Sequence, residues 1–211
     1  MGGEFTPNRQ RSLDAWKNLG FTPRLLLESD IVEMSRRGEI QLHPGFRFLT
    51  AVHKSDYLRS KFMYRYGGLY SDVKPPPPRI VSKTIRTIRR GVSFAGYQEV
   101  GINGVPPACG DPVRKNWRRL AGNGHFFFQP GTDFAGEWFS RVDAALEVKL
   151  EELENDSHIG LERFPIRNGS KVETYPFRWA EIHGEIFQPL QAEFGYPAAL
   201  SLPRPVVNDY I

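Results

Sequence analysis

The sequence predicts an α/β domain with a mostly parallel sheet flanked by helices. Short apolar segments rich in β-forming residues alternate with longer segments whose apolar residues recur every three or four positions. The clearest example is a helical pattern over residues 46–66 followed by a strand at Leu69–Val73. The chain has 211 residues and no repeat or linker, so we expect one domain over 1–211, with a flexible lead-in at 1–7.

Three elements are expected before the long helix. They are a short helix from Ser12, a buried strand at Leu25–Leu27, and a helix capped by Ser29 or Asp30 that stops at Gly38. The long helix then places one apolar stripe on a single face, formed by Phe48, Ala51, Ser55, Leu58, Phe62 and Tyr66.

Glycine and proline mark the end of the long helix and of the strand that follows it. Gly67-Gly68 ends the helix, because glycine readily adopts the positive φ of a helix C-cap. Pro75–Pro78 forces an extended exit loop. Ile80–Ile88 is a helix or a segment flanking a strand, and periodicity does not settle which. The later elements expected are strands at Val92–Tyr97 and Phe126–Phe128, a helix from Asp133 to about Leu153, and a final helix near Trp179–Phe187.

Composition restricts the class of protein. The net charge of +4 is scattered, with short basic clusters at Lys83–Arg90 and Arg114–Arg119, so solvated helix faces are favoured over a nucleic-acid surface. The single Cys109 allows no intrachain disulfide and no cysteine metal cluster. No apolar run approaches the roughly 20 residues of a membrane span, and the N-terminus lacks a signal peptide. We expect a cytoplasmic protein.

Charged residues lie on both sides of the glycine pair. Asp56 and Arg59 are one helical turn apart before it, and Asp72 and Lys74 follow the short strand after it. A parallel α/β sheet binds ligands beyond the carboxyl ends of its strands, where Asp72 is expected. From spacing alone, a ligand site and a simple turn before the prolines are equally open interpretations.

The same stretch resembles the donor-binding region of DXD-type glycosyltransferases, in the capsular-polysaccharide-synthesis and α-mannosyltransferase-like groups. Their pattern is S-D-x-x-R followed by Y-G-G-x-Y-x-D-x-D. The matching positions are Ser55, Asp56, Arg59, Tyr66, Gly67, Gly68, Tyr70 and Asp72. The resemblance implies a GT-A-like fold and transfer of a sugar from a UDP- or GDP-sugar to a glycan or glycoconjugate hydroxyl, with retention of configuration. Neither a nucleic-acid partner nor a membrane span is expected.

The resemblance also implies roles for individual residues. Asp72 would be catalytic and a metal ligand. The residues implied to bind the donor nucleotide are Asp56, Arg59, Gly67, Gly68, Tyr70, Lys74 and Asn123.

Lys74 departs from the pattern, because the family has a second aspartate there that binds Mn²⁺ or Mg²⁺. A lysine supplies no oxygen ligand. A metal could still bind through Asp72 and another side chain, Lys74 could itself neutralise the departing diphosphate, or the domain could be inactive.

The C-terminal part supplies two further candidates. Glu181 is a candidate catalytic carboxylate on the acceptor side, and His183 is a candidate metal ligand that would compensate for Lys74. An amphipathic helix with a solvated acidic face explains both residues equally well. His125 and Glu99 are weaker candidates near the donor pocket. Three other classes stay open, namely an inactive sugar-nucleotide-binding domain, a basic domain that binds anions or nucleic acid, and a purely structural domain that binds neither.

Overall fold

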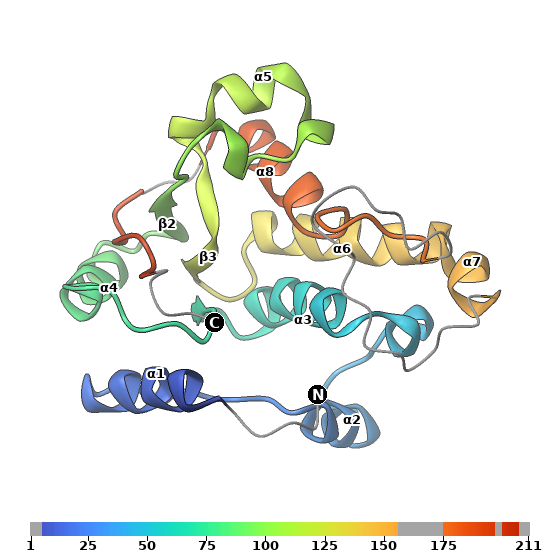
Figure 1. The fold of residues 1–211 in the computed structure, drawn as a ribbon, viewed down its shortest axis with the longest axis horizontal. Helices are drawn as coiled ribbons and strands as arrows, with labels where there is room; N and C mark the ends of the chain where they lie inside the picture. Colours follow the sequence, from blue (N-terminus) through green and yellow to red (C-terminus); the bar gives the residue numbers. More distant parts are fainter. Residues whose placement is uncertain (1–5, 156–174, 197–199, 207–211) are drawn as a thin grey trace.

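A computed structural model describes residues 6–155, 175–196 and 200–206, with helices arranged around a small sheet (Figure 1). The α-helices are α1 (Pro7–Asn18), α2 (Glu28–Arg36), α3 (Ala51–Arg65), α4 (Ile80–Arg89), α5 (Gly110–Lys115), α6 (Asp133–Val148), α7 (Leu150–Asn155) and α8 (Gly184–Glu193). The strands are β1 (Gly68–Ser71), β2 (Phe94–Gln98) and β3 (Ala121–Phe128). Short 3₁₀ turns are η1 (Pro44–Phe48), η2 (Ile102–Gly104), η3 (Pro107–Cys109) and η4 (Trp117–Arg119).

The sheet has the order β1-β3-β2, and both pairings are antiparallel. The α/β class is therefore confirmed, whereas the described strands do not form the mostly parallel sheet that we expected. The chain does contain a strand, the helix α4 and a second strand that runs the same way as the first. However, β3 returns between β1 and β2 in the opposite direction, with Phe126 paired to both Tyr70 and Gly96. Alternation of elements along a sequence does not reveal such an insertion.

Helices cover both faces of the sheet, because alternate side chains of β3 point to opposite sides. Phe126 and Phe128 belong to the larger core, together with buried residues of α3, α6 and α8 that include Tyr57, Trp138 and Phe187. Phe127 belongs to the second core, which contains Trp16 of α1, Ile80 of α4, Ala95, Tyr97 and Leu202. The residues between α3 and α4 therefore lie where the two cores meet.

Several predicted boundaries differ from those observed. The long helix begins at Ala51 rather than near 46, because the preceding Pro44–Phe48 forms the 3₁₀ turn η1 and Thr50 caps α3 by accepting a hydrogen bond from His53 N. The final helix begins at Gly184, since Trp179–His183 forms turns. Strand β3 extends back to Ala121 through its glycines, and α4 shows that Ile80–Ile88 is helical.

One further prediction was wrong near the N-terminus, and one boundary differs. Leu25–Leu27 is not a strand, because it pairs with no described strand, and Leu25 and Leu27 are 39% and 45% exposed. The expected lead-in at 1–7 overlaps α1, which begins at Pro7 with Thr6 as its N-cap. Residues 1–5 lie outside the described residues.

Candidate functional site

The turn between α3 and β1 brings the predicted charged residues together. Gly67 and Gly68 have φ angles of +61° and +93°, which favour glycine. A Cβ on Gly67 would lie 2.6 Å from both Phe128 O and Pro130 N, whereas a Cβ on Gly68 would meet open space. The chain therefore reverses tightly, and β1 packs beside the last turns of α3. Because Asp72 follows the other end of β1, the two glycines lie one strand length away from it. Their predicted contact with the donor stays a prediction.

Arg59 is the centre of the site. Its Nη2 lies 3.1 Å from Asp56 Oδ1 and 4.0 Å from Asp72 Oδ1. Its Nη1 donates to Asn123 O at 3.3 Å and lies 3.1 Å from His183 Nε2. The guanidinium carbon lies 4.6 Å above the ring of Tyr70. One side chain, only 10% exposed, thus joins α3 to β1, to β3 and to the residue that precedes α8.

Asp72 lies at the more exposed side of this network. Tyr70 donates its hydroxyl to Asp72 Oδ1 at 2.9 Å, and Lys74 Nζ lies 3.0 Å from Asp72 Oδ2. Burial raises the pKa of Tyr70, so the phenol stays a donor. The side chains of Asp72 and Lys74 are 24% and 16% exposed. The backbone is fixed as well, because Trp16 Nε1 donates to Lys74 O at 2.8 Å.

Asp56 is the most deeply buried carboxylate of the site. Burial raises its pKa to about 6, although the neighbouring Arg59 cation lowers it, and the negative charge of Asp72 adds to the increase. Asp56 is therefore ionised at neutral pH only by a small margin. Its place beneath Arg59 indicates that it orients the guanidinium towards Asp72.

His183 is buried against Trp138 and Phe187, which lie at ring-centroid distances of 5.5 Å each. Burial, and then the charge of Arg59, lowers its pKa well below the usual range. The ring is therefore neutral, and Nε2 accepts the hydrogen bond from Arg59. Its Nδ1 is buried without a hydrogen-bond partner among the described residues.

Two predicted residues of β3 lie beside this network. Asn123 contributes its backbone carbonyl to Arg59, while its side-chain Oδ1 is buried without a hydrogen-bond partner among the described residues. His125 is paired with Ser71 across the sheet, and its ring centroid lies 5.0 Å from that of Tyr97. Burial lowers the pKa of His125 to about 4. Both side chains are therefore uncharged near the Asp72–Lys74 pair.

Glu181 has different neighbours. It accepts from Lys149 Nζ at 2.6 Å and from Arg178 N at 2.9 Å. Burial opposes its ionisation, but the hydrogen bonds from Lys149 and from the Arg178 backbone, together with the charges of these two residues, outweigh that effect and lower its pKa. No described hydrogen bond or ion pair joins Glu181 to Arg59 or Asp72. Glu99, the weaker candidate, is buried with Gln188 at the far end of β2.

The residues present fit a divalent metal poorly. The described part of the chain contains no group of three or more His, Cys, Asp or Glu side chains that could hold a metal ion. Both carboxylate oxygens of Asp72 already accept from Tyr70 and Lys74, and Nε2 of His183 faces the Arg59 guanidinium. Two cations thus lie where ligands of a cation would be required. This arrangement suits an anion better.

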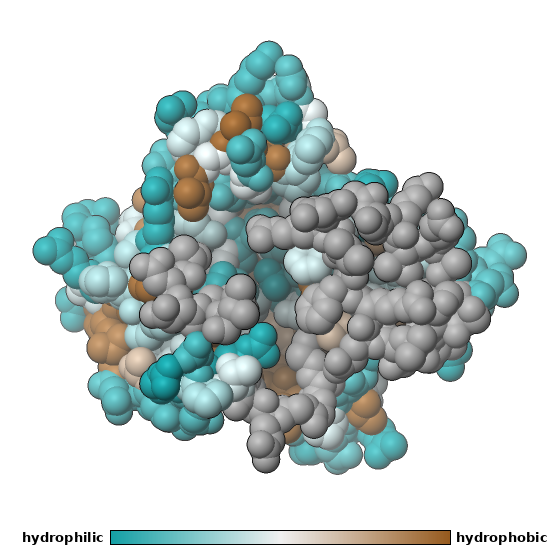
Figure 2. All heavy atoms as spheres, viewed as in Figure 1, coloured by the Kyte–Doolittle hydropathy of each residue, from teal (hydrophilic) through white to brown (hydrophobic). Residues whose placement is uncertain are grey.

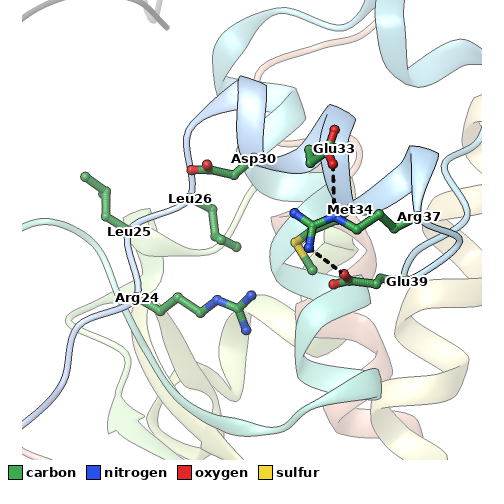
Figure 3. Close-up of a pocket in the computed structure, with 8 residues that line it drawn as sticks. All are labelled: Arg24, Leu25, Leu26, Asp30, Glu33, Met34, Arg37 and Glu39. Carbon is green, nitrogen blue, oxygen red and sulfur yellow. Dashed lines mark hydrogen bonds and ion pairs between the residues drawn. The ribbon is translucent and has the colours of Figure 1, made fainter.

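Two hollows on the described surface lie apart from this network. One, of about 290 Å³, carries charges of both signs, and in it Arg37 lies 3.0 Å from Glu33 and 3.4 Å from Glu39 (Figure 3). The other, of about 530 Å³, is lined by Lys61, Tyr64, Arg65 and Phe139, among others. Neither contains a predicted site residue. The candidate site is therefore a compact polar network rather than one of these cavities.

Comparisons with protein-family models, with curated proteins and with solved structures found no match to this chain. The resemblance to glycosyltransferases therefore depends on the motif residues themselves. Among the described residues, no helix is both long and apolar enough to cross a membrane.

Sequence reasoning missed two residues that support the site. Trp16 fixes the Lys74 backbone from α1, and Tyr97 of β2 accepts a hydrogen bond from Gly124 N through its hydroxyl at 3.1 Å. A Cβ on Gly122 would lie only 2.3 Å from the Tyr97 ring, which explains the glycines at this point of β3. Neither contact has a local sequence signal, because the partners are far apart in the chain.

Proposed function

We propose that the chain is a glycosyltransferase that uses a nucleoside diphosphate sugar as donor and a glycan or glycoconjugate hydroxyl as acceptor. One observation carries the proposal. The motif residues Asp56, Arg59, Tyr70 and Asp72 form a single contact network, and Lys74 joins it through Asp72. Proximity in the sequence explains the Asp56–Arg59 and Tyr70–Asp72 contacts. The contacts of Arg59 with Tyr70 and Asp72 join α3 to β1, so the fold brings the two halves of the motif together.

In the proposed reaction, the donor diphosphate binds on the exposed side of the network. Lys74 Nζ exchanges one oxygen of Asp72 for a phosphate oxygen, and Arg59 supplies a second cation with a rigid set of donors. As the bond between sugar and diphosphate breaks, the acceptor oxygen bonds to the anomeric carbon, and the acceptor hydroxyl proton passes to the departing diphosphate. Negative charge grows on this leaving group, and the two cations stabilise it. Asp72, still held by Tyr70, orients the sugar. The catalytic role predicted for Glu181 stays a prediction, as does retention of configuration.

We further propose that this donor site works without a divalent metal. The support is the arrangement of side chains described above. Lys74 and Arg59 lie on either side of the Asp72 carboxylate that a metal would need as a ligand. A requirement for Mn²⁺ or Mg²⁺ is the competing outcome. A GT-A-like fold is also part of the proposal, but the antiparallel sheet does not support that fold. The proposed function therefore depends on the site residues and not on the fold.

An inactive sugar-nucleotide-binding domain is the second candidate. The observation that favours it is the ion pair between Lys74 and Asp72, which occupies the carboxylate expected to do the chemistry. Binding and turnover separate the two candidates.

The experiment is a calorimetric screen of UDP- and GDP-sugars against the folded chain, with Mn²⁺ and with EDTA, followed by an assay for release of the nucleoside diphosphate. Binding with turnover supports the transferase. Binding without release of diphosphate, in the presence of glycan acceptors, supports the inactive domain. If no donor binds to folded protein, both candidates fail.

A further inference from the structure

Helix α4 has apolar residues on its exposed surface as well as on its buried one. Ile80, Thr84 and Thr87 are buried, and Ile80 belongs to the core that covers one face of the sheet. Ile85 and Ile88, three positions apart on one flank, are 44% and 53% exposed. The apolar stripe of the helix is thus wider than the face that the rest of the chain covers. In Figure 2, apolar and hydrophilic surfaces adjoin at the edge of the molecule that α4 occupies in Figure 1.

The charges around these isoleucines all have one sign. The cations of α4 and its two capping residues are Arg79, Lys83, Arg86, Arg89 and Arg90. No aspartate or glutamate occurs between positions 73 and 98. Within the described residues, none of the five cations forms an ion pair. The field around α4 is therefore uncompensated and attracts an anionic surface.

We propose that α4 is a membrane-surface helix that binds bilayers containing anionic lipids. The exposed flank of Ile85 and Ile88 enters the boundary between headgroups and acyl chains, and the surrounding cations bind lipid phosphate and carboxylate groups. The helix lies in the plane of the interface and does not span the bilayer. With 10 residues, it is far too short to do so.

The exposed side chains favour lipid over nucleic acid. A phosphate backbone would use the cations but would leave Ile85 and Ile88 in water. Proteins that bind single strands also offer aromatic rings for base stacking, and α4 contains none. Exposed isoleucines beside cations combine the apolar contact and the positive charge that bind a helix to an anionic lipid surface.

Binding through α4 would also hold the candidate site near the bilayer. Pro75–Pro78 connects Lys74 to the start of α4, and four prolines extend over only about 12 Å. Lipid binding itself does not depend on the proposed glycosyltransferase activity, although acceptors at the membrane surface would then be within reach of the donor site.

The test measures co-sedimentation of the full chain with two kinds of vesicle. One kind is made of phosphatidylcholine alone, and the other of phosphatidylcholine mixed with phosphatidylserine at about 30% of the lipid. Two variants remove the proposed contacts separately, namely Ile85→Ser with Ile88→Ser, and Arg86→Gln with Arg89→Gln. Two controls make the same kinds of change elsewhere. Val148→Ser removes an apolar side chain that is 82% exposed, and Arg118→Gln with Arg119→Gln removes the same charge from η4. Circular dichroism checks that every variant folds.

We expect wild type to bind the anionic vesicles and to leave phosphatidylcholine vesicles largely unbound. Each α4 variant should reduce the partition coefficient about tenfold or more, while both controls stay within about twofold of wild type. Absence of vesicle binding by folded wild type would overturn the proposal. So would an equal loss in the η4 control, because net charge alone would then explain binding. A parallel assay measures binding of a single-stranded oligonucleotide to wild type and to the arginine variant. If the isoleucine variant binds vesicles like wild type, while the arginine variant binds the oligonucleotide more weakly, α4 is a nucleic-acid surface and the proposal is wrong.

Discussion

Arg59 Nη1 lies 3.1 Å from His183 Nε2, although 124 positions separate the two residues in the chain. The imidazole is neutral and accepts the hydrogen bond, so one branch of the guanidinium is fixed by the segment before α8. The other branch is fixed by Asp56 from the preceding turn of α3. The end of the guanidinium is therefore held between two buried partners close to Asp72.

Removal of Arg59 should destabilise the fold strongly. Arg59→Met would leave Asp56 buried without its cation, and removal of one partner of a buried ion pair typically costs about 3–5 kcal/mol. Urea unfolding measures the change. The double variant Asp56→Asn, Arg59→Met removes both charges and should lose much less. A single variant as stable as wild type would show that Arg59 does not compensate a buried charge.

The raised pKa of Asp56 should make stability depend on pH. Folding raises this pKa from 3.8 to about 6, so the folded state holds the proton more tightly than the unfolded state. The contribution of Asp56 to the free energy of unfolding is therefore fully present below pH 3.8 and is lost as the pH rises through about 6. The whole loss amounts to about 3 kcal/mol. The difference in unfolding free energy between Asp56→Asn and wild type should shift in favour of the variant over this range. A difference that is constant from pH 4 to pH 7 would contradict the assignment.

Gly67 and Gly68 should differ in their tolerance of a side chain. Gly67→Ala combines positive φ with a Cβ placed 2.6 Å from backbone atoms, so we expect a loss of more than about 2 kcal/mol in unfolding free energy. Gly68→Ala has positive φ but open space and should cost only about 1–2 kcal/mol. Thermal unfolding of both variants provides the comparison, and equal losses would rule out the close packing of Gly67 against Pro130.

Lys74→Asp should introduce a metal requirement. The change places two carboxylates at positions 72 and 74 and removes the cation that occupies Asp72 Oδ2, which gives a divalent ion oxygen ligands. We expect donor binding by wild type to be the same in EDTA and in Mn²⁺, while the variant binds only in Mn²⁺. Dependence of the wild type on Mn²⁺ would refute metal-free binding but leave the transferase proposal intact.

Local features of the sequence predicted the centre of the fold well. Gly67-Gly68 ends α3, and the strand and proline loop follow where expected, because glycine and proline act on the backbone where they stand. The predicted helix was too long, because the aromatic residues of η1 continue its periodicity although Pro44 starts a 3₁₀ turn. The predicted core stripe was also wrong, because α3 buries Tyr57, Ser60 and Met63 instead, whereas Tyr66 is 42% exposed. Leu25–Leu27 shows the opposite failure, since an apolar run does not become a strand without a partner.

The candidate site was predicted only in part, because its contacts are long-range. Asp56 and Arg59 are one turn apart and could be paired from spacing. The insertion of β3 between β1 and β2, which brings Asn123 to Arg59, depends on strand pairing that periodicity does not encode. His183, predicted as a metal ligand, contacts Arg59 from the turn that precedes α8, and the segment Trp179–His183 forms turns rather than the expected helix. Its role as a ligand stays a prediction.

The central claim is that the network around Arg59, Asp72 and Lys74 binds a nucleoside diphosphate. Calorimetric titration of UDP and GDP, in EDTA, into wild type, Lys74→Gln and the exposed control Arg90→Gln tests it most directly. We predict that at least one nucleotide binds wild type and the control equally, and binds Lys74→Gln at least about tenfold more weakly, since a charge-assisted contact is lost. Equal binding by Lys74→Gln would contradict the claim, and so would the absence of binding of either nucleotide to folded wild type both in EDTA and in a parallel titration with Mn²⁺.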